Sequence, residues 1–189
     1  MREFIGVIAG LALVLCLTYP GFARSGATFQ AETGQKPNFT GAWQPDPARS
    51  TVKRHAKDDP QKELPPPPPS DDDDEPSGPQ TTKIQHKDPS ISIMTTSPGA
   101  EDVSVLNLTT DGRENTNPVD EESTNKSKTH WDGDKLVTEW AVEQYGKVMY
   151  KGTDVRSLSK DGAEMIVDTR LETDEGIVEL HQVFVRKPK

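Results

Sequence analysis

Residue types that do chemistry are present in this sequence, but few have the spacing of a catalytic or metal site. The histidines are His55, His86, His130 and His181, and no two of them stand at the His-x-x-x-His spacing of a zinc site. There is no Gly-x-Ser-x-Gly motif and no glycine-rich phosphate loop, and the single cysteine, Cys16, lies in a segment that we expect to be removed. We predict a protein that is not an enzyme and that uses no metal ion or other cofactor.

Asp154 and Arg156 are the charged residues with the most unusual setting, because they share a strand face with apolar side chains. Residues alternate between the two faces of a strand, so Tyr150, Asp154, Arg156 and Leu158 point to the same side. If Leu158 faces the interior, the two charges form a pair inside or at the mouth of a barrel, where they would anchor the head group of a ligand. The alternative is a bulge near Gly152 that turns both charges to solvent.

Large apolar side chains on this and neighbouring strands are the other candidate ligand contacts. They are Trp131, Trp140, Tyr150 and Met165, and with Asp154 and Arg156 they make up the candidate ligand-binding set. Because the interior of a small barrel is often filled by side chains, the alternative for the apolar members is ordinary core packing.

The acidic run 71–75 is a second place where carboxylates gather. A calcium loop spaces its ligands and contains a turning glycine, whereas this run is contiguous and follows the consecutive prolines 65–69. The surrounding residues are rich in Pro, Asp, Lys and Glu and have too little apolar surface to offset the entropy of ordering. We therefore predict that 51–80 is a disordered insert and that its acidic run is a solvated spacer.

The elements that must position the candidate residues are short alternating strands. Turn-forming pairs such as Asp111-Gly112, Asp132-Gly133 and Asp161-Gly162 separate runs of β-branched and aromatic residues, as in an antiparallel meander. The predicted strands are 82–87, 90–96, 102–109, 113–116, 127–131, 135–142, 148–158, 163–171 and 177–186. Closure of such a meander removes its edges, so the fold class is all-β, a small up-and-down barrel of about eight strands.

Composition divides the rest of the chain. Residues 1–23 have the apolar core and small-residue end of a secretory signal peptide, which places the protein outside the cytoplasm, secreted or periplasmic, with no membrane span after cleavage. We assign 24–37 to a mature tail, 38–50 to a first barrel strand and 81–189 to the main barrel; alternatively, 24–80 is all tail. The net charge of −9 argues against nucleic acid as a partner.

Six short motifs follow one another in a characteristic order. They are NFTGAW at 38–43, DPARS at 46–50, IQHKDPS at 84–90, TDGRE at 110–114, WDGDKL at 131–136 and LSKDG at 158–162. In this order they resemble a group of secreted bacterial lipocalin-like β-domain proteins of uncharacterised function. The resemblance covers nearly all of the mature chain apart from the acidic insert, and it implies a lipocalin-like barrel.

The resemblance also implies how the barrel closes. Lipocalins open with Gly-x-Trp on their first strand, and a basic residue near the end of the last strand packs over that Trp; Gly41, Trp43 and Arg186 match these positions. The alternative is an ordinary core Trp and a solvated terminal Arg. The sequence departs from the group at Arg156, where the group's pattern has a tryptophan.

These observations predict an exported, non-enzymatic, lipocalin-like protein that binds a small apolar or amphipathic ligand in a barrel cavity. The alternative is a structural or interaction protein of the cell envelope whose barrel is filled and whose surface or insert binds a protein partner that the sequence does not identify.

Overall fold

The computed structural model describes residues 36–59, 61–65, 80–97 and 103–187, all of which belong to one compact unit, Thr33–Lys189. The predicted signal peptide 1–23, nearly all of the predicted tail 24–37 and the acidic run 71–75 lie outside the described residues. Among the described residues there is no helix with the length and hydropathy that crossing a membrane requires.

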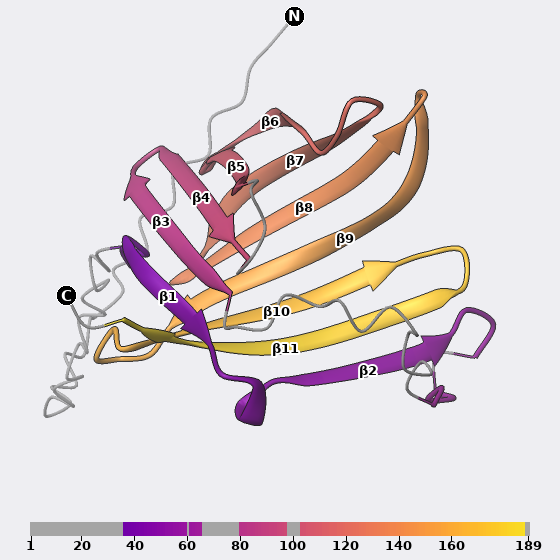
Figure 1. Cartoon of the computed structure of the whole chain (residues 1–189), viewed down its shortest axis with the longest axis horizontal. Coiled ribbons are helices and arrows are strands. Elements are labelled where there is room, and N and C mark those ends of the chain that lie inside the picture. The colour runs from indigo at the N-terminus through magenta and orange to yellow at the C-terminus, as the bar shows by residue number, and fades with distance from the viewer. Residues whose placement is uncertain (1–35, 60, 66–79, 98–102, 188–189) are drawn as a thin grey trace, which may run out of the picture. The chain divides into compact units, whose positions relative to one another are not determined.

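Eleven strands and one 3-10 turn account for most of the described chain (Figure 1). The strands are β1 (Gly41–Pro45), β2 (Thr51–Ala56), β3 (Thr81–Lys87), β4 (Ser90–Thr96), β5 (Val103–Thr109), β6 (Asp111–Pro118), β7 (Ser123–Asp132), β8 (Lys135–Gln144), β9 (Lys147–Leu158), β10 (Glu164–Glu172) and β11 (Gly176–Arg186). The 3-10 turn η1 (Pro47–Arg49) joins β1 to β2. The predicted all-β class is confirmed.

All pairings are antiparallel and form one sheet in the order β5-β4-β3-β1-β11-β10-β9-β8-β7-β6, with β2 also paired to β11. The sheet curls round so that its first and last strands, β5 and β6, lie next to each other (Figure 1). There the Asn117 side chain bridges the backbone of Asn107, accepting from its N–H at 2.8 Å and donating to its carbonyl at 2.9 Å. The result is a nearly closed, lipocalin-like barrel.

Strand alternation builds the core as expected. On β8, Leu136, Thr138 and Val142 are buried while Glu139 is exposed, and β10 buries Met165 and Val167 in the same way. The β8–β9 turn is tight because Tyr145 and Gly146 both adopt positive φ, 51° and 75°, as a two-residue hairpin requires. The central cluster consists of Phe39, Trp43, Ile84, Ile91, Ile93, Leu108, Leu136, Met165, Val167 and Phe184.

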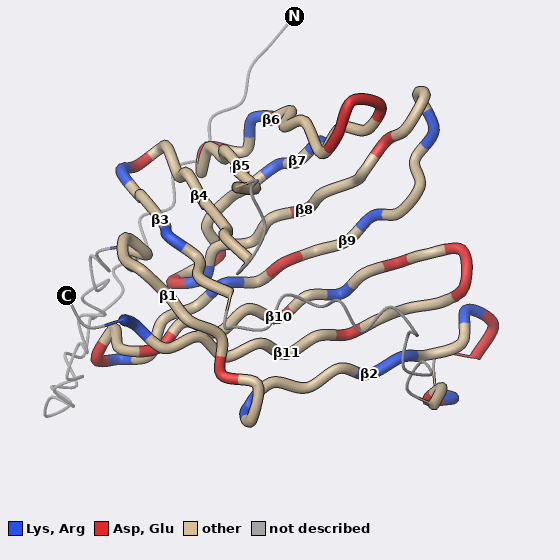
Figure 2. The backbone as a smooth tube through the Cα atoms, in the orientation of Figure 1, with Lys and Arg blue, Asp and Glu red and all other residues tan. Residues whose placement is uncertain are grey.

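The outer face is polar. Lys, Arg, Asp and Glu recur along the long strands β7 to β11, as the coloured tube shows (Figure 2). Many of these charges pair across strands, for example Lys126 with Glu143 at 2.7 Å and Arg170 with Glu179 at 3.0 Å. Cross-strand pairs of this kind make an outward face soluble and contribute little individually to stability.

Three expectations about the elements need correction. The segment 51–80 was expected to be disordered, but Thr51–Ala56 forms β2 and pairs with β11 from His181 to Gly176. The reason is that β1 covers only the end of β11 at Phe184–Arg186, so the rest of that edge offers free backbone hydrogen-bonding groups to the next stretch of chain. The described part of the chain accordingly has eleven strands, not about eight. The predicted strand 38–50 is shorter, because Pro47 begins η1.

Candidate ligand-binding site

A cavity of about 260 Å³ lies on the inner face of the barrel. Its apolar wall consists of Ile84, Ile93, Met165, Val167 and Phe184. Its polar wall consists of Gln80, Thr82, Thr95, Asp154, Arg156, Thr169 and Gln182. The residues come from β3, β4, β9, β10 and β11 and the residue before β3, so chain segments far apart in sequence meet only after the sheet has curled.

Asp154 and Arg156 form an ion pair at the polar wall. Arg156 Nη2 lies 2.9 Å from Asp154 Oδ2, and the two side chains are only 11% and 13% exposed, respectively. The Thr169 hydroxyl donates to Asp154 Oδ1 at 2.8 Å. Arg156 Nη1 donates to the Thr138 hydroxyl at 3.4 Å, and that hydroxyl shares a 3.0 Å hydrogen bond with Thr129. The five residues form a polar belt across β7, β8, β9 and β10.

Register explains why the belt is continuous. Thr138 and Thr169 both stand opposite Asp154, and Thr129 stands opposite Thr138. The β8–β9 irregularity falls at Val142/Glu143, before Gly152, so it does not turn the charges outward. The side chains of Asp154 and Arg156 therefore point inward, as in the first of the two interpretations of this pair. Gly152 instead accommodates an indole: an added Cβ would lie 2.7 Å from Trp140 Cζ2.

The other candidate residues separate into three places. Met165 is 2% exposed and lines the cavity. Trp140 and Tyr150 lie against each other, ring centroids 6.1 Å apart and nearly perpendicular, farther along β8 and β9 and outside the cavity lining. Trp131 stacks on Phe39 and His86 at centroid distances of 6.1 and 5.9 Å, in a separate aromatic cluster.

Gly41, Trp43 and Arg186 meet where the first and last strands pair. Trp43 stands opposite Arg186, whose guanidinium lies 4.3 Å from the Trp43 ring centroid. Arg186 also donates to the carbonyls of Thr40 and Gly162 at 2.6 and 3.0 Å. A Cβ on Gly41 would overlap Arg186 Nη1, so glycine leaves the space that the guanidinium occupies. The fully buried Trp43 donates through Nε1 to Phe39 O at 3.0 Å.

A buried histidine supports the neighbouring end of the barrel. His86 Nδ1 accepts from the Phe39 N–H at 3.3 Å, so Nε2 carries the hydrogen and donates to Asp88 Oδ1 at 3.0 Å. This hydrogen bond, with help from the Thr110 hydroxyl, holds the pKa of Asp88 below its usual value despite partial desolvation. These hydrogen bonds have a structural role, because they tie the residues before β1 to β3.

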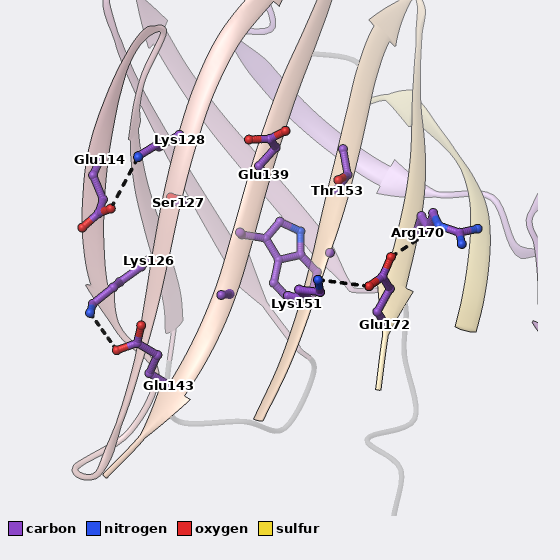
Figure 3. Close-up of a pocket in the computed structure, with 13 residues that line it drawn as sticks. Glu114, Lys126, Ser127, Lys128, Glu139, Glu143, Lys151, Thr153, Arg170 and Glu172 are labelled. Atoms are coloured by element: carbon purple, nitrogen blue, oxygen red, sulfur yellow. Dashed lines mark ion pairs between the residues drawn. The ribbon is translucent and has the colours of Figure 1, made fainter. Parts of the chain in front are cut away.

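The outer face carries a depression of about 430 Å³, shown in close-up in Figure 3. Most of its charges already have partners: Lys126 with Glu143, Lys128 with Glu114, and Lys151 with Glu172, at 2.7, 3.8 and 3.3 Å. Such exposed, mutually paired side chains describe a solvated sheet surface.

Catalytic and metal chemistry find little support in the described ranges. His181 Nδ1 lies 2.6 Å from Asp168 Oδ1 on the outer face, but no hydroxyl in the described part of the chain is hydrogen-bonded to this ring. Within the same ranges no group of three or more His, Cys, Asp or Glu side chains is arranged to hold a metal ion.

Sequence reasoning missed several cavity residues, among them Thr82, Thr95 and the apolar pair Ile84 and Ile93, and it also missed Thr129 of the polar belt. Each has the inward parity of its strand, so alternation could have placed it on the correct face. Alternation does not reveal which strands lie across the barrel from β9 and β10, and that information was needed.

No protein family profile matches this chain, and no curated protein sequence matches it either. Among solved structures it is similar to a secretary abundant heat soluble protein from Ramazzottius varieornatus, with 13% identity, a TM-score of 0.50, and coverage of 78% of this chain and 94% of that one. It is also similar to a zebrafish ileal bile acid-binding protein complexed with cholic acid (11% identity, TM-score 0.49, 79% and 98% covered) and to the REP1-NXSQ fatty acid transporter (13%, 0.48, 79% and 96%). At these identities the likeness concerns the fold, an antiparallel lipocalin-like β-barrel.

Proposed function

We propose that this protein is an exported binding protein, not an enzyme, which carries a small apolar or amphipathic molecule inside its barrel. The observation that supports the proposal is the cavity of about 260 Å³, which has an apolar wall and a nearly buried ion pair in its polar wall. Binding sites for small molecules combine apolar lining with polar groups that fix the ligand's orientation; in this cavity five apolar residues face seven polar ones.

The binding mechanism follows from the two walls. The apolar part of the ligand would lie against Ile84, Ile93 and Phe184, gaining about 25 cal/mol for each Å² of apolar surface removed from water. The polar part would hydrogen bond to Arg156 or Asp154 and so keep one orientation. The cavity, at about 260 Å³, is slightly smaller than the roughly 300–1,000 Å³ found for ligand sites, which favours a small molecule.

Native mass spectrometry of the protein purified from its own exported fraction tests this proposal. We expect a small molecule that is present in stoichiometric amount and is released on denaturation, and a protein mass that corresponds to cleavage after residue 23. An uncleaved mass would contradict signal-peptide cleavage, and absence of the protein from the exported fraction would contradict export. A clean apo mass, with no change of tryptophan fluorescence across a panel of apolar ligands, would contradict the carrier function and favour an interaction protein of the cell envelope.

A cavity-filling variant makes the test specific to the site. Val167→Phe adds a ring to a residue that is 5% exposed and lines the cavity, so binding should be lost. Val155→Phe is the matched control, because Val155 lies beside Asp168 and lines a depression on the outer face, so binding should persist. Circular dichroism of both variants checks that they are folded.

A further inference from the structure

The charge of the cavity bears on what kind of ligand it accepts; this step rests on the function proposed above. Asp154 and Arg156 are the only ionisable side chains in the described cavity lining, and they contact each other at 2.9 Å. Their charges cancel. A carboxylate placed against Arg156 would also lie beside Asp154, and the site would then hold two negative charges and one positive in a partly desolvated space.

Hydrogen-bonding capacity nevertheless remains on both members of the pair. Within the described residues, Arg156 donates only to Asp154 and Thr138, and a guanidinium has further N–H groups. Asp154 accepts from Arg156 and Thr169 and keeps further lone pairs. A neutral group that both accepts and donates matches this combination, whereas a carboxylate can only accept.

We propose that the ligand of this barrel has an uncharged hydrogen-bonding head group, a hydroxyl or an amide, and that Asp154 excludes free carboxylates. Asp154 is then the specificity-determining residue. Fatty alcohols and fatty amides belong to the accepted class. The negative charge of Asp154 disfavours fatty acids of the same length.

Decanol and decanoate form a matched pair of probes. Their binding to the delipidated mature protein is measured at pH 8 by native mass spectrometry and by tryptophan fluorescence. We expect decanol to bind at least about tenfold more tightly, the factor that corresponds to an uncompensated charge contact. In Asp154→Asn the amide oxygen can face Arg156 and its nitrogen Thr169, so both contacts persist without the negative charge. This variant should bind decanoate at least about tenfold more tightly than the unmodified protein does.

Asp168→Asn is the control variant, because it removes the same charge from the outward-facing neighbour of Thr169 on β10. It should leave both affinities unchanged. If the unmodified protein binds decanoate as tightly as decanol, charge exclusion is overturned and the carrier function stands. If neither probe binds to any variant, and each variant has the circular dichroism of a folded barrel, both proposals are overturned. The comparison on the unmodified protein does not depend on the folding of a variant.

Discussion

At the scale of single residues, Arg186 joins the last strand to the first. Its guanidinium lies over Trp43 and donates to the carbonyls of Thr40 and Gly162. We expect Arg186→Ala to lower the free energy of unfolding by about 1–3 kcal/mol, since it removes a cation–π contact and two hydrogen bonds from a charged donor. Urea denaturation measures the change.

Two comparison variants make the Arg186 experiment informative. Arg186→Lys keeps the charge but cannot present a planar fork to two carbonyls, so its loss should be intermediate. Lys160→Ala removes an exposed cation from the adjoining turn and should be neutral. Equal effects of Arg186→Ala and Lys160→Ala would show that the Arg186 contacts do not stabilise the barrel.

Asp88 gives the protein a defined acid sensitivity. The His86 hydrogen bond lowers the pKa of Asp88 in the folded state, so the folded state binds this proton less readily than the unfolded chain does. The stabilisation is therefore fully present above about pH 4, the usual aspartate range, and is lost as the pH falls through the lower folded value. Unfolding curves of the unmodified protein and of Asp88→Asn should converge in acid and separate at neutral pH. Asp134→Asn, in the exposed β7–β8 turn, is the control and should follow the unmodified protein at every pH.

At the scale of elements, amide side chains of β6 bridge the seam between β5 and β6, and Asn117 is the one that bonds to the β5 backbone. The buried Asn117 side chain satisfies both backbone groups of Asn107. Asn117→Ala leaves that N–H and that carbonyl without partners, and we expect a loss of about 2 kcal/mol and faster hydrogen exchange of the Asn107 amide. Asn115→Ala removes contacts to the Thr109 hydroxyl and the Arg113 carbonyl, so its effect should be smaller. Exchange at Asn107 that is no faster in Asn117→Ala would mean that the seam is held by other groups.

The β5–β6 seam and strand β2 are also the features that could not be predicted from the sequence. Alternation and turn pairs predicted β3–β5 and β8–β11 with nearly their observed bounds, because those strands pair with chain neighbours, whereas β7 was predicted at 127–131 and begins four residues earlier, at Ser123. β2 was missed because Thr51–Ala56 becomes a strand only through the distant edge of β11. The same limit applies to the site: the strand parity of Asp154 and Arg156 was readable from the sequence, but the facing wall from β3 and β4 depends on how the sheet closes.

At the scale of the whole molecule, we expect the length of the connection between residues 65 and 80 to matter and its sequence not to. Residues 66–79 are all Pro, Ser, Asp, Glu or Gly, which offer little apolar surface to bury. Replacing them with Gly and Ser at equal length keeps the loop-closure entropy, so the melting temperature and ligand binding should not change. A lower melting temperature would show that this segment packs on the barrel. Loss of a partner with unchanged stability would instead favour the envelope-interaction function.

We also expect the whole sheet to unfold cooperatively, and the three tryptophans can report on this unfolding from different places. Trp43 lies on β1, Trp131 on β7 and Trp140 on β8, and one continuous ladder of strands connects them. Because each strand depends on neighbours on both sides, we expect the sheet to unfold as one unit. In protein labelled with 5-fluorotryptophan, the three fluorine resonances should lose intensity with the same urea midpoint and slope. Trp131→Phe and Trp140→Phe assign the resonances. An earlier midpoint for Trp140 alone would contradict two-state unfolding and show that the part of the barrel beyond the polar belt opens first, on the side where Tyr150 packs on the indole.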